Sequence, residues 1–236
     1  MIPKVIHYCW FGGKPLPQEV KKCIKSWKRY APDFEIIQWN ESNFDVNLHP
    51  FVKSAFECSA WAFVSDYARL KIVYDYGGIY LDTDVELLKS IDDLLENKFF
   101  IGTQQGGYPT TGLGFGAEKG NRTVSDMLKE YDSLIYVDSV KKKVTCPLLN
   151  SKVIYELGYS YTDSIWKKND VTVYPNRYFD PIAQGDTQCL LCEETYSIHH
   201  YAGSWTPWSQ RMRRRIIRLI GEERIHKIKV LLGKAK

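Results

Sequence analysis

Two aspartates separated by one residue, Asp82 and Asp84, carry the strongest chemical signal in the sequence. They follow the glycine pair Gly77-Gly78 and the short apolar stretch 79–81. Burying an unpaired charge is strongly unfavourable, so two carboxylates at the end of an apolar strand need a partner. In an extended segment alternate side chains share a face, which would place these two roughly 6.5 Å apart along the strand. Like charges at that spacing repel each other unless a cation lies near them.

A hard divalent cation is the partner that this pair fits best. Mg²⁺ or Mn²⁺ accepts carboxylate oxygens and shares its remaining positions with water and phosphate oxygens. The sequence therefore predicts that Asp82 and Asp84 hold Mg²⁺ or Mn²⁺ bound to a diphosphate. A solvated turn is the alternative, because a DxD pattern occurs by chance in many chains.

The elements expected before this pair would deliver it to the edge of a sheet. Strands at 4–10 and 34–39 flank a helix at 18–30, which predicts an α/β unit with a parallel sheet. A second helix is predicted over 59–76, because apolar residues recur there at helical spacing, and Gly77 suits a left-handed cap. The strand at 79–81 then carries the aspartates to its C-terminal end, where ligands gather in open α/β sheets.

The pattern after the aspartates is looser but extends the same architecture. We expect one domain, with further elements at 90–97 (short helix), 98–102 and 112–117 (strands), 121–135 (helix), and 171–174 and 196–200 (strands).

Composition places the chain among globular proteins. Its 236 residues suffice for one sizeable core. The 7 Trp, 16 Tyr and 10 Phe could line a carbohydrate or nucleotide site, although core packing is the commoner role. No stretch approaches the roughly 18 apolar residues of a membrane span, and the first residues lack the features of a signal peptide. Cys189 and Cys192 form a single CxxC, interpreted as free thiols rather than a zinc or redox site. We therefore expect a reducing, cytoplasmic location.

Charge is divided unevenly along the chain. The net charge is +4, yet residues 211–236 contain ten Lys or Arg against two Glu, or +8, which leaves −4 for the first 210 residues. Apolar residues at near-helical spacing between these cations predict a basic amphipathic helix over 209–236, which could lie on an anionic membrane. A helix docked on its own domain or in a dimer is the alternative. Nucleic acid could also attract the charge, but no nucleic-acid module accompanies it.

Taken together, residues 65–84 resemble the signature SDxxRxxxLxxxGGxYxDxD of the DXD-containing sugar transferases of family 32. Val73 stands where the signature has Leu. This family includes bacterial capsule and exopolysaccharide transferases and fungal mannosyltransferases, and is related to the glucosylating toxins. The opening segment 2–12, "IPKVIHYCWFG", and the segment 198–205, "IHHYAGSW", are similar to its first strand and closing motif.

The resemblance implies a fold, an activity and a set of partners. The fold is α/β and GT-A-like, with a central mixed sheet flanked by helices in a single domain over 1–208, plus the helical segment 209–236. The activity is transfer of a hexose from a nucleotide-sugar, with UDP preferred over GDP, with retention of configuration and with Mn²⁺ or Mg²⁺ as cofactor. The acceptor is a saccharide or lipid-linked saccharide in surface polysaccharide synthesis, at the inner face of the plasma membrane.

The resemblance also implies roles for individual residues. Asp84 would bind the metal directly, and Asp82 would contact the ribose and the metal shell. Asp66 and Arg69 would hold hydroxyls of the donor sugar, although two residues three apart on a helix could instead form a surface ion pair. Trp10 would lie near the base.

Several other residues have two readings. Tyr80 would frame the donor or simply pack in the core, and His7 is as compatible with a core position as with a site. Late residues that could complete the metal or donor shell are His199, His200, Ser204 and Trp205. Imidazole suits Mn²⁺, and because strand alternation sends the two histidines to opposite faces, only one should reach the site.

Two functions of other classes compete with the transferase. The pattern "YLDTDVE" also fits a haloacid-dehalogenase-type phosphatase, with the first Asp as nucleophile. A non-catalytic module that binds a nucleotide-sugar or a membrane surface is the other alternative.

Overall fold

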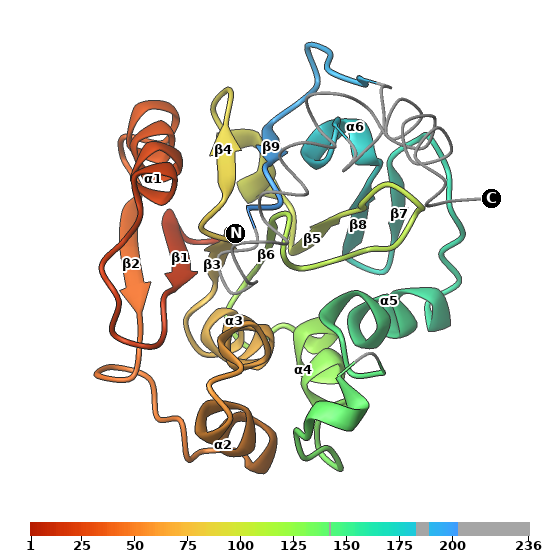
Figure 1. The fold of residues 1–236 in the computed structure, drawn as a ribbon. Helices are drawn as coiled ribbons and strands as arrows, with labels where there is room; N and C mark the ends of the chain where they lie inside the picture. Colours follow the sequence, from red (N-terminus) through yellow and green to blue (C-terminus); the bar gives the residue numbers. More distant parts are fainter. Residues whose placement is uncertain (142, 183–188, 203–236) are drawn as a thin grey trace, which may run out of the picture.

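A computed structural model describes residues 1–141, 143–182 and 189–202 of the chain. Its centre is a seven-stranded mixed sheet with the strand order β2-β1-β3-β6-β5-β8-β7 (Figure 1). The strands are β1 (Val5–Cys9), β2 (Glu35–Trp39), β3 (Gly78–Tyr80), β5 (Phe99–Gly102), β6 (Phe115–Ala117), β7 (Trp166–Lys168) and β8 (Val171–Tyr174). β1 runs parallel to β2 and β3, as the predicted α/β unit requires, whereas β6 is antiparallel to both of its neighbours.

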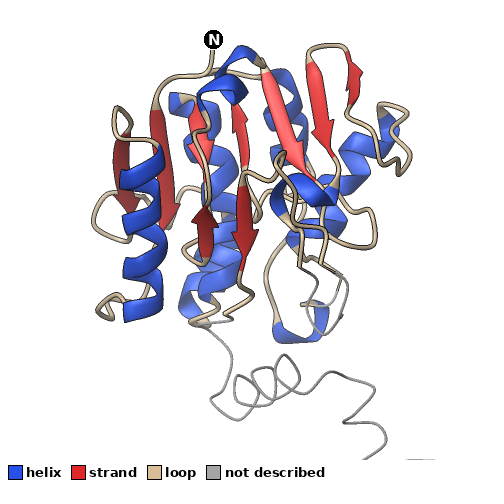
Figure 2. Cartoon of the chain, turned by 90° about the horizontal axis from the view of Figure 1, so that it is seen from above, coloured by secondary structure: helices blue, strands red, loops and turns tan. Residues whose placement is uncertain are grey.

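Helices cover both faces of this sheet, as Figures 1 and 2 show. On one face lie α2 (Pro50–Glu57), α3 (Trp61–Tyr76), α4 (Arg122–Lys129) and α5 (Cys146–Glu156), and on the other lie α1 (Gln18–Tyr30) and α6 (Asn176–Phe179). The 3₁₀ helices are η1 (Asp92–Glu96) and η2 (Asp138–Val140). Apolar side chains form one buried cluster on each face, which accounts for much of the aromatic content.

A small second sheet stands beside α1. It pairs β4 (Val85–Leu87) with β9 (Ser197–His199) in antiparallel register, with Val85 opposite His199. The indole N–H of Trp27, in α1, donates to the carbonyl of Val85 at 2.8 Å. This two-stranded sheet therefore holds together two segments that lie more than a hundred residues apart in the sequence.

The connection from α3 to β3 depends on glycine. Gly77 ends α3 with φ at +71°, and its N–H donates to the carbonyl of Val73 at 2.8 Å. A Cβ at Gly77 would lie 2.9 Å from the backbone nitrogen of Lys119. The expected positive φ is confirmed, and the close approach of another backbone adds a second reason for glycine.

Some predicted elements differ from the structure. The helix expected over 121–135 stops at Lys129, because a series of tight turns follows and carries the Tyr131 ring into the core against Phe51 and Tyr67. The helix expected over 90–97 is the 3₁₀ helix η1. Helices α2, α5 and α6, the 3₁₀ helix η2, and strands β4 and β7 were not predicted. The segment 209–236 lies outside the described residues.

Candidate active site

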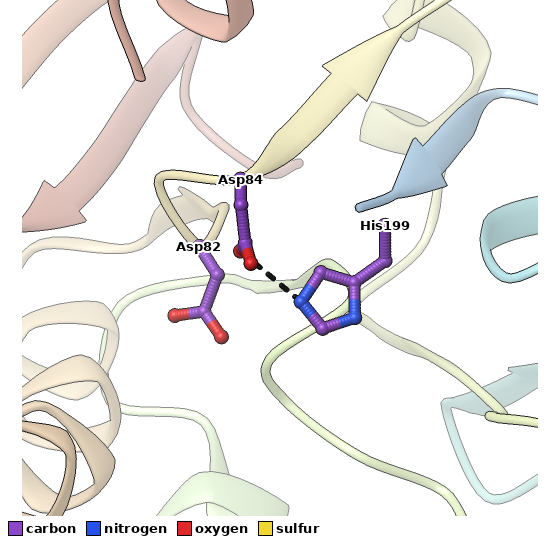
Figure 3. Close-up of side chains that lie close together, drawn as sticks. All are labelled: Asp82, Asp84 and His199. Carbon is purple, nitrogen blue, oxygen red and sulfur yellow. Dashed lines mark hydrogen bonds and ion pairs between the residues drawn. The ribbon is translucent and has the colours of Figure 1, made fainter. Parts of the chain in front are cut away.

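The two aspartates of the DxD motif lie in a reverse turn between β3 and β4. The N–H of Val85 donates to the carbonyl of Asp82 at 3.0 Å, which closes the turn. The expectation of an extended segment is therefore wrong at this point, because pairing of β4 with β9 redirects the chain immediately after Asp84. The turn still brings both carboxylates to the same region (Figure 3).

Asp84 is buried and held by the segment that contains β9. Its Oδ1 lies 3.1 Å from Nε2 of His199, and its Oδ2 accepts a hydrogen bond of 2.8 Å from the N–H of Ala202. Figure 3 shows the Asp84 carboxylate and the His199 ring directed toward one another, with Asp82 beside them. One acidic and one imidazole group from distant parts of the chain thus meet at the site.

Asp82 is held from the opposite side by α3. Nη2 of Arg69 lies 3.0 Å from Oδ1 of Asp82 and 3.1 Å from Oδ1 of Asp66. The hydroxyl of Tyr80 donates to the same Asp82 oxygen at 3.2 Å, and the Arg69 guanidinium lies over the Tyr80 ring. Since Arg69 is 5% exposed, the alternative of a surface ion pair is wrong, and one buried cation is shared by two carboxylates.

Burial and neighbouring charges shift the pKa values of the carboxyl groups and the histidine in the site. Burial alone would raise the pKa of Asp84, but the charge and hydrogen bond of His199, together with backbone N–H groups such as that of Ala202, outweigh it and lower that pKa to about 2. Burial alone would lower the pKa of His199, but the charge and hydrogen bond of Asp84, together with the charges of Asp82 and Asp180, outweigh it and raise that pKa. Burial raises the pKa of Asp66 to about 6, with Arg69 opposing, and it raises the pKa of Asp82 in the same way.

Asp82, Asp84 and His199 fit a divalent cation. Each offers one ligand atom, and the three atoms lie within 4.8 Å of one another. Two carboxylate oxygens and an imidazole nitrogen form a donor set that Mn²⁺ accepts, and Mg²⁺ would use chiefly the oxygens. A cation would replace the His199–Asp84 contact and relieve the repulsion between the carboxylates.

The two neighbouring histidines occupy different surroundings, as strand alternation predicts. His199 joins the aspartates, whereas Nε2 of His200 lies 2.8 Å from Oε2 of Glu86. The proposal that His200 binds the metal is thus not supported by its placement.

The other predicted residues lie as follows. Tyr80 is fully buried and also reaches Asp82, so it serves both the core and the site. Trp10 follows β1, is partly buried and donates from its indole to the carbonyl of Lys14 at 2.6 Å. His7 is a core histidine, because Trp39 donates to its Nδ1 at 3.1 Å and its Nε2 lies 2.8 Å from the carbonyl of Gly77. Ser204 and Trp205 lie outside the described residues.

The loop before β6 and the start of α5 add site residues that sequence reasoning missed. A Cβ at Gly112 would lie 2.7 Å from Oδ2 of Asp82, so this loop closes directly over the carboxylate. The Cys146 thiol lies 3.6 Å from Nη1 of Arg69 and 3.0 Å from the hydroxyl of Thr111. Asn150 donates to both Thr111 and Cys146. The glycines around 112 were a visible signal of close approach, but nothing marked Cys146 or Asn150.

Sequence comparison connects this site with sugar transfer. Residues 17–100 match the family described as a glycosyltransferase sugar-binding region containing a DXD motif. An uncharacterized glycosyltransferase of Acanthamoeba polyphaga mimivirus is 25% identical over 221 residues, which cover 88% of this chain and 85% of the viral protein. The resemblance inferred from the motifs is thereby confirmed.

Two yeast proteins and one solved structure extend the comparison. Inositol phosphoceramide mannosyltransferases 3 and 1 of Schizosaccharomyces pombe are 29% and 31% identical over 119 and 111 residues, or 48% and 42% of this chain. The match spans one third of each yeast protein, 33% in both. The structure of PaToxG glycosyltransferase is similar with a TM-score of 0.52 at 16% identity, over 66% of this chain and 69% of that one, which confirms the expected fold. These matches favour a transferase over the phosphatase alternative.

Proposed function

Since the chain is a glycosyltransferase of the GT-A type, we propose that it moves a hexose from a nucleotide-sugar to a saccharide or lipid-linked saccharide, with a divalent metal and with retention of configuration. The observation that carries the proposal is the meeting of Asp82, Asp84 and His199 beside the buried Arg69. This arrangement offers ligands for a metal bound to diphosphate next to groups that can bind sugar hydroxyls.

Each group has a task in this proposal. Asp84 and His199 would hold Mn²⁺ or Mg²⁺ together with Asp82, and the bound ion would neutralise charge on the leaving diphosphate. Arg69 fixes the orientation of Asp82 through its 3.0 Å contact and keeps the Asp66 carboxylate in place. Asp66, with its remaining acceptor capacity, would accept hydrogen bonds from donor hydroxyls. The roles of Trp10 at the base and of Ser204 and Trp205 in the donor shell remain part of the proposal.

The donor and acceptor are proposed by class. UDP-glucose and UDP-galactose are the first donors to test. GDP-mannose is the second candidate, because the yeast relatives are named mannosyltransferases. Their names also specify a lipid acceptor, inositol phosphoceramide, which supports a lipid-linked acceptor here. A role in capsule or other surface polysaccharide synthesis, at the cytoplasmic face of the membrane, belongs to the same proposal.

Calorimetric titration of UDP and of GDP, with and without Mn²⁺, tests the site. We expect Mn²⁺-dependent binding of one nucleotide by the wild-type chain and loss of that binding in Asp84→Asn. Asp126→Asn is the matched control, because Asp126 lies on the surface of α4 beside Lys129 and should leave binding unchanged. Failure of both nucleotides to bind under every metal condition would overturn the proposal.

Hydrolysis of the nucleotide-sugar separates an enzyme from a binding module. Slow Mn²⁺-dependent release of free hexose, absent in Asp84→Asn, supports catalysis. Binding without any turnover, with acceptors present, would favour the non-catalytic alternative.

Membrane association is proposed only through the basic segment 209–236. Among the described residues, the structure contains no helix with the length and apolar character needed to cross a bilayer. The net charge of +8 over 211–236 would instead attract an anionic surface.

A further inference from the structure

The segment that ends β9 surrounds Asp84 with three contacts. The N–H of His200 donates to the backbone carbonyl of Asp84 at 2.9 Å. Of the two carboxylate oxygens of Asp84, Oδ1 lies 3.1 Å from Nε2 of His199, and Oδ2 accepts a hydrogen bond of 2.8 Å from the N–H of Ala202. Because these contacts come from almost successive residues, the path of the chain through residue 201 decides whether all three can form together.

Tyr201 adopts the backbone conformation that makes this path. Its φ is +49°, in the left-handed region that costs a residue with a Cβ about 1 kcal/mol or more. Such a conformation persists only where the surroundings hold it. The Tyr201 ring lies against the His199 ring, with 4.1 Å between centroids, and its hydroxyl donates to Oδ2 of Asp180 at 2.7 Å.

Asp180 is a fixed anchor for that hydroxyl. It follows α6, is fully buried, and its N–H donates to the carbonyl of Asn176 at 2.7 Å. Its Oδ2 also accepts from the N–H of Gln105 at 2.9 Å. A buried carboxylate is unfavourable unless it is hydrogen-bonded or paired with a cation. Sequence analysis assigned no role to Asp180.

Two buried polar atoms at this place have no hydrogen-bond partner within 1–141, 143–182 and 189–202. They are Oδ1 of Asp180 and Nδ1 of His199. Asp180 and His199 each keep one polar atom that no other described residue satisfies. Such atoms in a folded protein call for an explanation, and a water molecule or an ion bound at the site is one.

We propose that Asp180 and Tyr201 form a latch that positions the His199 ring and the Ala202 N–H on Asp84, and thereby sets the geometry of the metal site. The inference rests on the proposed metal dependence and adds two positioning residues to it. The latch acts by holding Tyr201 in its left-handed conformation, with the Asp180–Tyr201 hydrogen bond as the fixed point. Partners behind metal ligands typically change metal affinity about 10- to 100-fold when removed.

Mn²⁺ titration of the full chain, without nucleotide, tests the latch. Tyr201→Phe keeps the ring against His199 but removes the hydroxyl, and we expect Mn²⁺ affinity to fall about 10-fold or more. The metal-free variant should remain folded, with a thermal midpoint a few degrees lower, because the buried Asp180 carboxylate loses one donor. Tyr178→Phe is the matched control, since that buried ring belongs to α6, just before Asp180, but its hydroxyl donates to Glu194. It should bind Mn²⁺ like the wild type.

A second variant, Asp180→Asn, covers the case in which Tyr201→Phe does not fold. The amide oxygen of the variant can still accept a hydrogen bond from the Tyr201 hydroxyl, so we expect a smaller loss of Mn²⁺ affinity than in Tyr201→Phe. The double variant with both substitutions should lose no more Mn²⁺ affinity than Tyr201→Phe alone. Wild-type Mn²⁺ affinity in a folded Tyr201→Phe variant would overturn the latch while leaving the proposed function intact. Unfolding of both single variants would assign the pair to the core and overturn the latch as well. Absence of Mn²⁺ binding by the wild-type chain would overturn the proposed metal dependence and the latch together.

Discussion

At the scale of one residue, Asp66 shows that the site contains a carboxylate whose charged form is destabilised by burial. Its carboxylate is buried beside Arg69, and burial raises its pKa from 3.8 to about 6. Between these two pH values the folded chain keeps a proton that the unfolded chain releases. The contribution of Asp66 to the free energy of unfolding therefore falls as the pH rises from about 4 to about 6, and most of the carboxylate is charged above that.

Asp66→Asn should remove this pH dependence. Relative to the variant, the wild-type chain should lose roughly 2–3 kcal/mol of unfolding free energy between pH 4 and 6, since one pKa unit corresponds to about 1.4 kcal/mol. Urea unfolding of both metal-free proteins across this range measures the difference. Parallel stability curves would contradict the assigned burial of the charge. Donor affinity should nevertheless fall in the variant if Asp66 accepts sugar hydroxyls.

At the scale of elements, the site depends on how closely a loop approaches a turn. The loop before β6 passes Asp82 so tightly that a Cβ at Gly112 would lie 2.7 Å from Oδ2 of Asp82 and 3.2 Å from Nη1 of Arg69. The turn cannot move away, because Arg69 and Tyr80 both hold the other oxygen of Asp82. An added methyl group must therefore displace either the carboxylate or the loop.

Gly112→Ala should weaken binding of Mn²⁺ and nucleotide by about 10- to 100-fold, because changes in the groups that orient metal ligands have effects of this order. Calorimetry measures the binding loss, and a thermal melt checks that the chain folds. Gly120→Ala gives the contrasting pattern. That glycine has φ +72° and no atom within 4 Å of an added Cβ, so the change should cost about 1 kcal/mol of stability without changing affinity. Unchanged binding in Gly112→Ala would show that the loop yields.

At the scale of the whole molecule, charge separates the body of the chain from its last residues. The first 210 residues carry −4 and residues 211–236 carry +8. Replacing Arg213, Arg214 and Arg215 by Gln in the full chain should reduce binding to anionic phosphatidylserine vesicles by roughly 100-fold, since each cation near such a surface contributes about 1 kcal/mol. Vesicle sedimentation at two salt concentrations measures this.

The same variant should keep Mn²⁺-dependent nucleotide binding, which serves as its control. Neutral phosphatidylcholine vesicles should bind neither form strongly. Equal binding of wild type and variant to anionic vesicles would contradict the membrane proposal and favour docking of this segment on protein.

Much of the site was readable in the residues because its parts are close together in the chain. Asp66 and Arg69 are one helical turn apart, Gly77 is required by its backbone conformation, and Asp82 and Asp84 follow a three-residue strand. Local spacing and propensity determine such features, so they can be predicted without knowledge of the rest of the fold. The family resemblance rests largely on this same short unit.

Contacts across long sequence distances could not be read in that way. The register that sets Val85 opposite His199 selects His199 over His200, and the pairing of β4 with β9 bends the DxD segment into a turn. A positioning role for Tyr201 could be inferred only once the structure placed Oδ2 of Asp180 2.7 Å from its hydroxyl. Strand register and side-chain packing arise from the free energy of the whole folded chain, and local sequence preferences carry little information about either.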